Sequence, residues 1–221
     1  DIKKVGHGGT LDPFATGVLP VAFGKATRLL EYILNNDKHY RATIELGIRT
    51  DTYDREGKVL DQRDSSAITD KDVNHILSKY HGEIVQGPPR YSAIKVQGQR
   101  SYELARSGSS FEIRPRTVKV YYIHLVEFNP PLLIVDIKCG KGFYVRSFAE
   151  DLGKSLQCGA YLKELQRLSS GPFNIEESIE LHRVVSSFDE GTESEIMKEP
   201  GSCLEGLAVI KLNRNCKTAK R

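Results

Sequence analysis

The chain has 221 residues, of which 39% are hydrophobic and 28% are charged. This length and composition fit one large domain, or one domain with part of a second, and exclude disordered and collagen-like chains. No apolar run approaches the roughly 20 residues that a membrane-spanning helix needs, so we do not expect a membrane protein. The 32 Lys and Arg residues against 29 Asp and Glu give a net charge of only +3, so the distribution of charge must decide whether nucleic acid is a partner.

The first half of the chain carries alternating strand and helix signals. Residues 38–46 alternate between apolar and polar side chains, which predicts a strand with one buried face. Thr69 and Asp72 have capping-box spacing and predict a helix over residues 68–80. Further strands are predicted over residues 18–23 and 91–96, and further helices over residues 26–34 and 99–106.

In the second half, two runs rich in β-branched and aromatic residues, 116–128 and 132–139, predict a β-hairpin. A helix is predicted over residues 144–156. Strands joined by short turns, with helices between groups of them, indicate an α+β domain built on a mixed or antiparallel central sheet with flanking helices. Beyond about Ser186 the composition is that of a linker, and residues 208–221 are basic.

The most unusual segment is glycine-rich and covers residues 6–17. It is not a phosphate-binding loop, because Gly24-Lys25 is followed by Ala26 rather than Ser or Thr, and no dinucleotide-binding fingerprint is present. Within it, Asp12 precedes a proline, which confines its backbone to extended or turn geometry. By residue type alone Asp12 is a turn residue, and His7 a solvated or core histidine.

Arg146 is predicted just inside a helix start, where the positive end of the helix dipole opposes a cation. A carboxylate partner would remove this objection, and the arginine would in turn lower the pKa of that acid and keep it ionised. Tyr40, at the start of its strand face, reads as a core aromatic. Basic and aromatic residues interleave over residues 90–106, which fits a solvated helix face and a groove for nucleic acid equally well.

The four cysteines are widely spaced and form no C-x-x-C pair. In a chain of this length this pattern favours reduced thiols in the cytoplasm over a disulfide framework or a zinc site. Neither a metal-binding motif nor a hydrolase nucleophile elbow is present in the sequence.

Taken together and in order, the motifs resemble those of the TruB-type tRNA pseudouridine synthases, from Val5 to about Phe173. The matching segments are GHGGTLDPFATGVLP at residues 6–20, KHY at 38–40, LGIRTDTYD at 46–54, PPRYSAIK at 88–95, GFYVR at 142–146 and LQR at 165–167. The resemblance implies a pseudouridine synthase fold with an inserted RNA-clamping segment. It also implies isomerisation of uridine 55 in the T arm of tRNA, in which the N-glycosidic bond is broken and the base is rejoined through C5.

The resemblance assigns the chemistry to three residues. Asp12 matches the catalytic aspartate, Tyr40 the tyrosine that packs on the flipped base and takes part in proton removal, and Arg146 the arginine that pairs with the aspartate. Tyr144 and Leu165 match residues of the uracil pocket. The remaining residues expected to bind substrate are His7, Asp54, Lys95 and Arg106, of which the last two lie in the clamping segment.

The resemblance further implies that no cofactor or metal is needed and that the partner is the tRNA T stem-loop. We expect a monomer without an obligatory protein partner, a catalytic domain over residues 1–185 that lacks the N-terminal strand of its relatives, and a linker with the start of a PUA-type module over residues 186–221. Two alternatives remain open at this point. One is an RNA-binding or tRNA-folding module, and the other is the catalytic subunit of a guide-RNA-dependent pseudouridylation particle.

Overall fold

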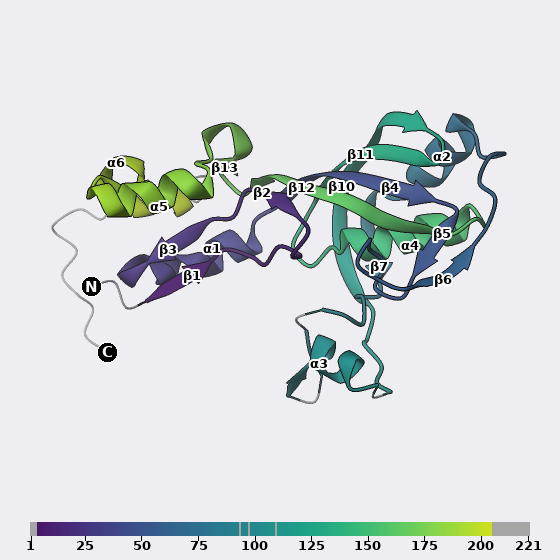
Figure 1. The fold of residues 1–221 in the computed structure, drawn as a ribbon, viewed down its shortest axis with the longest axis horizontal. Helices are drawn as coiled ribbons and strands as arrows, with labels where there is room; N and C mark the ends of the chain where they lie inside the picture. Colours follow the sequence, from purple (N-terminus) through teal and green to yellow (C-terminus); the bar gives the residue numbers. More distant parts are fainter. Residues whose placement is uncertain (1–3, 93, 97, 109, 205–221) are drawn as a thin grey trace, which may run out of the picture.

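The computed structural model describes residues 4–92, 94–96, 98–108 and 110–204. Its centre is a seven-stranded sheet (Figure 1) in which all neighbours are antiparallel except one parallel pair. The main path of the sheet runs β13 (Phe173–Asn174), β12 (Ala160–Ser170), β4 (Lys38–Leu46), β11 (Leu132–Cys139), β10 (Arg116–Asn129) and β7 (Gly82–Gln86). The seventh strand, β2 (Thr16–Gly17), pairs in parallel with β12. The predicted α+β class and mixed sheet are confirmed.

The core lies between one face of this sheet and two helices, α2 (Asp70–Leu77) and α4 (Val145–Ser155). In β4 the apolar positions Ala42, Ile44 and Leu46 are almost fully buried, as the alternating pattern predicted. Helix α4 packs closely on β12, since a Cβ atom at Gly153 would lie 2.1 Å from the backbone nitrogen of Ala160. This packing fixes the start of α4, and therefore Arg146, relative to the sheet.

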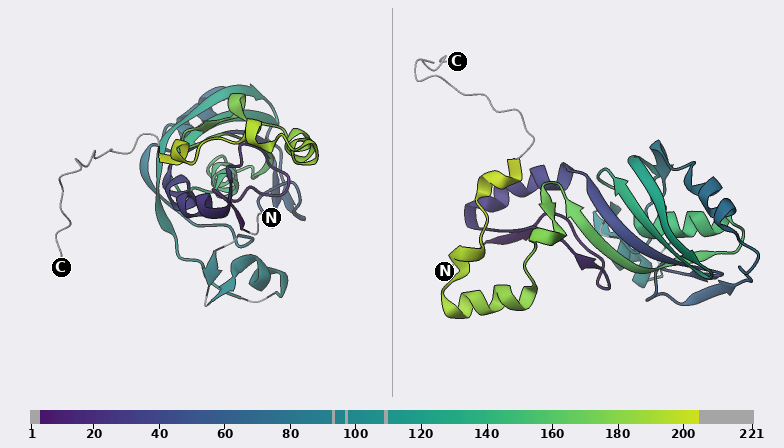
Figure 2. Two further views of the ribbon diagram at one scale, coloured as in Figure 1. Left: turned by 90° about the vertical axis from the view of Figure 1, so that its left-hand side faces the viewer. Right: turned by 90° about the horizontal axis from the view of Figure 1, so that it is seen from above.

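At one end of the molecule the chain forms a smaller layer, which Figure 1 and the right-hand view of Figure 2 show beside the central sheet. It contains the two-stranded sheet β1–β3, helices α1 and α5, and the short helix α6. Phe23 of β3 packs against Phe188 of α5, with ring centroids 6.0 Å apart. The bounds are β1 Val5–His7, β3 Val21–Phe23, α1 Leu30–Asn35, α5 Leu181–Glu190 and α6 Glu193–Ile196.

Two further segments complete the fold. The ribbon β5 (Ile48–Thr50) and β6 (Val59–Gln62) follows β4 along the chain. Between β7 and β10 an insertion containing β8 (Lys95–Val96), β9 (Gln99–Arg100) and α3 (Ser101–Arg106) projects away from the sheet (Figure 1).

Most predicted elements are confirmed, and the differences concern the type or the extent of single elements. The helix expected over residues 26–34 is a 3₁₀ turn, Gly24–Leu29, followed by the short α1, and the strand expected over 91–96 contracts to β8. Residue 185, where we expected a domain boundary, lies inside α5, and residues 208–221 lie outside the described part of the chain. Within the described residues, no helix is long and apolar enough to cross a bilayer.

Candidate active site

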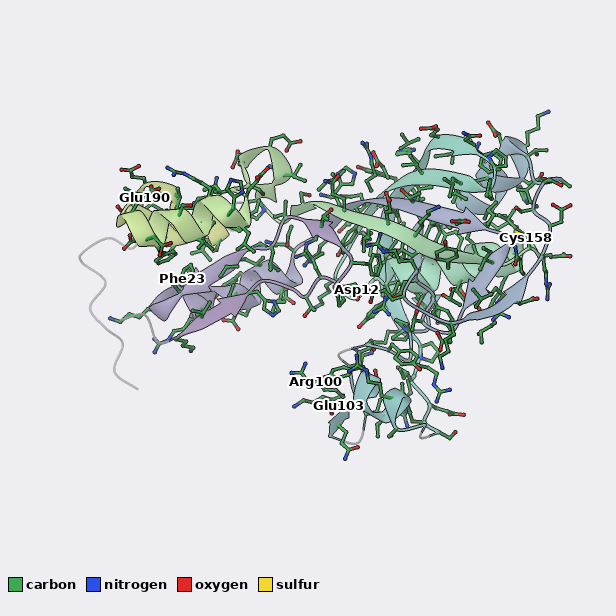
Figure 3. The ribbon with its side chains drawn as sticks, viewed as in Figure 1. Asp12, Phe23, Arg100, Glu103, Cys158 and Glu190 are labelled. Carbon is green, nitrogen blue, oxygen red and sulfur yellow. The ribbon has the colours of Figure 1, made fainter. Side chains whose placement is uncertain are left out.

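The three predicted catalytic residues lie close together, and Figure 3 labels one of them, Asp12, where the smaller layer meets the central sheet. Asp12 lies in the loop between β1 and β2, and its label in the figure marks this junction. Tyr40 lies on β4, and Arg146 occupies the first turn of α4. Three segments that are distant in sequence thus contribute to one site.

Arg146 connects two carboxylates. Its Nη2 atom donates to Oδ1 of Asp12 at 2.8 Å, and its Nη1 atom lies 3.4 Å from Oδ2 of Asp54. The arginine side chain is 7% exposed and that of Asp12 is 28% exposed. These anions offset the unfavourable position of a cation at a helix start. Asp12 is therefore both paired and accessible to a ligand.

The ionisation of Asp12 reflects two opposing effects. Burial raises its pKa, because the charged carboxylate loses solvation, whereas Arg146 lowers it; the charge of Asp54 adds a smaller upward contribution. The net direction is upward. Arg146 lowers the pKa of Asp12, as expected of a cationic partner, but desolvation outweighs the ion pair.

Asp54 is engaged within the protein. Its Oδ1 atom accepts hydrogen bonds from Thr52 Oγ1 at 2.6 Å and from the backbone nitrogen of Glu56 at 3.0 Å, while Oδ2 faces Arg146. The residue is only 5% exposed. These contacts suit it to orienting Arg146 rather than to touching substrate.

Tyr40 lies on β4 of the central sheet, near the loop that carries Asp12. In the register of β4 and β12 it lies opposite Arg167, and on the other side it faces Ile137 of β11. Burial raises the pKa of Tyr40 to about 12, and the nearby charge of Asp12 acts in the same direction. The phenol is therefore neutral at neutral pH and offers a flat aromatic face with a hydrogen-bonding hydroxyl.

Two of the predicted substrate-binding residues lie close to this centre. Leu165 of β12 is 7% exposed and pairs with Ala42 of β4, two positions from Tyr40. Tyr144 precedes α4, and burial raises the pKa of its phenol. The phenols of Tyr40 and Tyr144 lie near enough to Asp12 for its charge to act on both, and Leu165 adds an apolar side chain beside Tyr40 on the sheet.

Three other predicted residues lie on exposed positions of the surrounding surface. His7 ends β1, Lys95 begins β8 in the insertion, and Arg106 ends α3 with its guanidinium 5.6 Å from the ring centroid of Tyr102. None has a hydrogen bond or ion pair to Asp12 in the described part of the chain. Their positions suit contacts with a large ligand that extends beyond the Asp12 centre.

The sequence did not predict the hydrogen bonds that hold β7 and the start of the insertion after it to the beginning of α4, next to Arg146. Gln86 exchanges two hydrogen bonds with the backbone of Tyr144, at 2.8 and 3.1 Å, and Ser147 Oγ donates to the carbonyl of Gly87 at 2.7 Å. Arg146 Nη2 also donates to the carbonyl of Tyr91 at 3.0 Å. The double proline after Gly87 indicated a break in the chain, but not these contacts.

A cavity of about 610 Å³ lies elsewhere, between the end of β4, β6 and the Pro130-Pro131 turn. A second, of about 290 Å³, lies beside Arg49 and the end of α4. Asp12, Tyr40 and Arg146 line neither cavity. Within the described residues, no group of three or more His, Cys, Asp and Glu side chains is arranged to hold a metal ion.

Comparison with known proteins shows the family of the chain. Residues 1–145 match the family described as "TruB family pseudouridylate synthase (N terminal domain)", so the chain belongs to the TruB family of pseudouridylate synthases. Residues 146–200 match the "tRNA pseudouridylate synthase B C-terminal domain".

Among similar proteins, tRNA pseudouridine synthase B of Francisella philomiragia subsp. philomiragia is 49% identical over 180 residues, covering 81% of this chain and 60% of the relative. The protein of that name from Clostridium tetani is 48% identical over 183 residues, covering 83% and 63%. The chain thus spans about three fifths of the length of these relatives. The solved structure titled "Crystal Structure of a Cbf5-Nop10-Gar1 Complex" has a TM-score of 0.71 at 30% identity, covering 92% of this chain and 54% of that one.

Proposed function

We propose that this chain isomerises uridine to pseudouridine at position 55 in the T-arm loop of tRNA. The observation that carries the proposal is the accessible Asp12 carboxylate held at 2.8 Å by the buried Arg146. Membership of the TruB family and relatives named tRNA pseudouridine synthase B support the same reaction.

The reaction moves a base without adding or removing atoms. The bond between N1 and the ribose breaks, the bond between C5 and the ribose forms, and the hydrogen lost from C5 is balanced by one gained at N1. A base inside a T loop must first be flipped out, which costs a few kcal/mol, and stacking and pocket contacts must recover that cost. Tyr40, Tyr144 and Leu165 are suited to supply those contacts.

The roles of the charged residues follow from their contacts. The ionised carboxylate of Asp12 acts on the flipped nucleoside. Arg146 holds that carboxylate in place, and the second carboxylate, that of Asp54, orients Arg146. We propose that His7, Lys95 and Arg106 bind the surrounding RNA. A neutral Tyr40 must give up its own proton before it can accept one from the base, because its pKa is about 12.

For the whole chain we propose a catalytic domain that extends beyond the expected limit at residue 185, because α5 continues to Glu190, followed by a linker and the start of a PUA-type module. We further propose that the enzyme works in the cytoplasm as a monomer, without a cofactor or an obligatory protein partner. The partner we propose is the T stem-loop of tRNA.

The decisive experiment is to incubate the full chain with an unmodified tRNA transcript and map pseudouridine along the RNA. The proposal expects modification at position 55 alone. Modification at other positions only, or tRNA binding with no modification under any condition, would contradict it. The latter result would favour a module that binds or folds tRNA.

A guide-RNA-dependent catalytic subunit is a second candidate, favoured by the structural likeness to a protein solved in a Cbf5-Nop10-Gar1 complex. The same assay separates the two candidates. Activity on a bare transcript, with no added RNA or protein, supports the tRNA synthase. Activity that appears only with a guide RNA and accessory proteins supports the second candidate.

Replacing Asp54 by Asn is expected to shift the pH dependence of turnover. Because the charge of Asp54 contributes to the raised pKa of Asp12, its removal should lower that pKa. Activity requires ionised Asp12 and is lost as the pH falls through this pKa, so the acid limb of the rate profile should move to lower pH. Single-turnover rates measured against pH check this, and an acid limb that moves to higher pH would contradict it.

Replacing Arg106 by Ala is expected to weaken RNA binding and to make its salt dependence shallower by about one charge. The measurement is the slope of log K against log salt concentration for a T-arm stem-loop. Glu103→Gln on the same helix provides a control, because it removes an anion and should not make the slope shallower. An unchanged slope in the Arg106 variant would place that residue outside the phosphate contacts.

A further inference from the structure

Arg167 on β12 is the largest of the side chains that are almost fully buried, with 1% of its surface exposed. A guanidinium buried without partners is strongly destabilising, so its contacts must compensate for lost hydration. Among the described residues no carboxylate lies within ion-pair distance of it. Its guanidinium instead donates to three backbone carbonyl groups, which all belong to the segment that carries Asp12.

The carbonyl partners of Arg167 lie on both sides of Asp12 in the sequence. Its Nη2 and Nη1 atoms donate to the carbonyls of Gly9 and Thr10 at 3.0 and 3.4 Å, and its Nε atom donates to the carbonyl of Val18 at 2.7 Å. One side chain therefore fastens the beginning and the end of the segment 9–18.

The backbone of the same residue adds a second attachment. The nitrogen of Val18 donates to the carbonyl of Arg167 at 2.9 Å, and Gly17 pairs with Arg167 between β2 and β12. Gly17 has a φ of +99°, and a Cβ atom there would lie 2.2 Å from the Arg167 carbonyl oxygen. Only glycine permits this close approach.

Arg167 also reaches the second predicted catalytic residue. It lies opposite Tyr40 in the pairing of β12 with β4, and its guanidinium acts to lower the pKa of the Tyr40 hydroxyl. The same planar group thus binds the Asp12 segment and lies beside Tyr40. Arginine suits this arrangement, because five N–H donors in a rigid fork can serve several acceptors at once, whereas the single ammonium of lysine cannot match the fork geometry.

We propose that Arg167 is a positioning residue that fixes the Asp12 segment relative to Tyr40. This inference rests on the proposed pseudouridine synthase function. It does not require Arg167 to touch the RNA, since the side chain is buried beneath the loop. Reacting groups must be held to a fraction of an ångström, and a displacement of about 1 Å can lower a rate about 100-fold.

The test compares Arg167→Lys in the full chain with Arg49→Lys as a matched control. Arg49 is an arginine that is only partly buried, and it pairs with Glu150 away from Asp12, with Nη2 at 2.7 Å from Oε1. For Arg167→Lys we expect the single-turnover rate on a T-arm stem-loop to fall by 10- to 100-fold while Kd for the RNA stays within about threefold. For Arg49→Lys we expect both quantities to stay within about threefold.

A second readout separates positioning from a general loss of stability. A loosened segment lets water reach Asp12, so the raised pKa of its carboxyl should fall and the acid limb of the single-turnover profile should move to lower pH. The control should leave that limb in place. If Arg167→Lys does not fold, Arg167→Gln, which keeps two side-chain donors, is tested in the same way.

The inference is overturned if a folded Arg167 variant retains the wild-type rate and pH profile. It is also overturned if both variants fail to fold while the Arg49 control folds, which would make Arg167 a core residue only. An inactive wild-type chain would instead contradict the proposed function itself, so the two failures are distinguishable.

Discussion

Asp12→Asn is expected to abolish pseudouridine formation while Kd for a T-arm stem-loop stays within about tenfold of wild type, equivalent to about 1.4 kcal/mol. The amide has nearly the same shape as the carboxylate but cannot act as an anionic nucleophile or base. The measurement pairs single-turnover assays at saturating enzyme with a direct binding titration. Turnover by the variant at a rate comparable to wild type would remove Asp12 from the chemistry.

The same substitution is not expected to lower the free energy of unfolding appreciably. A carboxyl group whose pKa is raised by folding favours the folded state while it is protonated, and this contribution is lost as the pH rises through the raised pKa. Because the pKa of Asp12 is raised, its ionisation opposes folding at neutral pH. Urea denaturation of the variant at pH 7 checks this, since a large loss of stability would show that the Asp12–Arg146 pair stabilises the fold.

Arg146→Met is expected to abolish turnover and also to destabilise the protein by about 3–5 kcal/mol, because it leaves two carboxylates close together without their cation. Asp12 and Asp54 would then repel each other, and the carbonyl of Tyr91 would lose its donor. Arg146→Lys should recover part of the stability but little of the activity, since one ammonium cannot replace the two arms of the guanidinium. Urea denaturation and single-turnover assays measure the two effects separately.

Arg41→Met is the matched control for the Arg146 variants. Arg41 also pairs with an aspartate, Asp136, at 2.8 Å, but its side chain is 47% exposed. Exposed ion pairs contribute roughly 0–1 kcal/mol, so both stability and activity should change little. Equal losses in the Arg41 and Arg146 variants would contradict a special role for Arg146.

Local patterns predicted three neighbouring strands of the central sheet, β4, β11 and β10. The alternation over residues 38–46 gave the bounds of β4, and the two β-branched runs gave the β10–β11 hairpin. The Thr69–Asp72 spacing is a true capping box at the start of α2. In these elements the local preference of the sequence and the tertiary packing agree, which is why sequence alone sufficed.

Strand β12 was missed, although it carries Leu165 and Arg167. Its pairing with β4 shifts register between Leu162 and Glu164 and again between Arg167 and Ser169. Each irregularity interrupts the alternation of apolar and polar residues by which a strand is recognised. A buried arginine in this run also reads as a surface position when only the sequence is considered.

The sequence motifs predicted that Arg146 and Tyr40 lie near Asp12, but not the net effect of burial and ion pairing on the pKa of Asp12. Pairing with Arg146 suggested a lowered pKa, whereas partial burial of Asp12 outweighs the ion pair and raises it. The hydrogen bonds of Gln86, Tyr91 and Arg167 depend on backbone groups brought together by tertiary structure. No spacing in the sequence encodes those contacts.

The most direct test of the central claim is a crystal structure of the full chain bound to a T-arm stem-loop. We expect one extruded nucleoside, with its base against Tyr40 and its ribose or ring carbon about 3–3.5 Å from a carboxylate oxygen of Asp12. Arg146 should still donate a hydrogen bond to the other carboxylate oxygen of Asp12. A bound RNA whose nucleosides all remain stacked in the loop, or whose flipped base lies away from Asp12, would contradict the account.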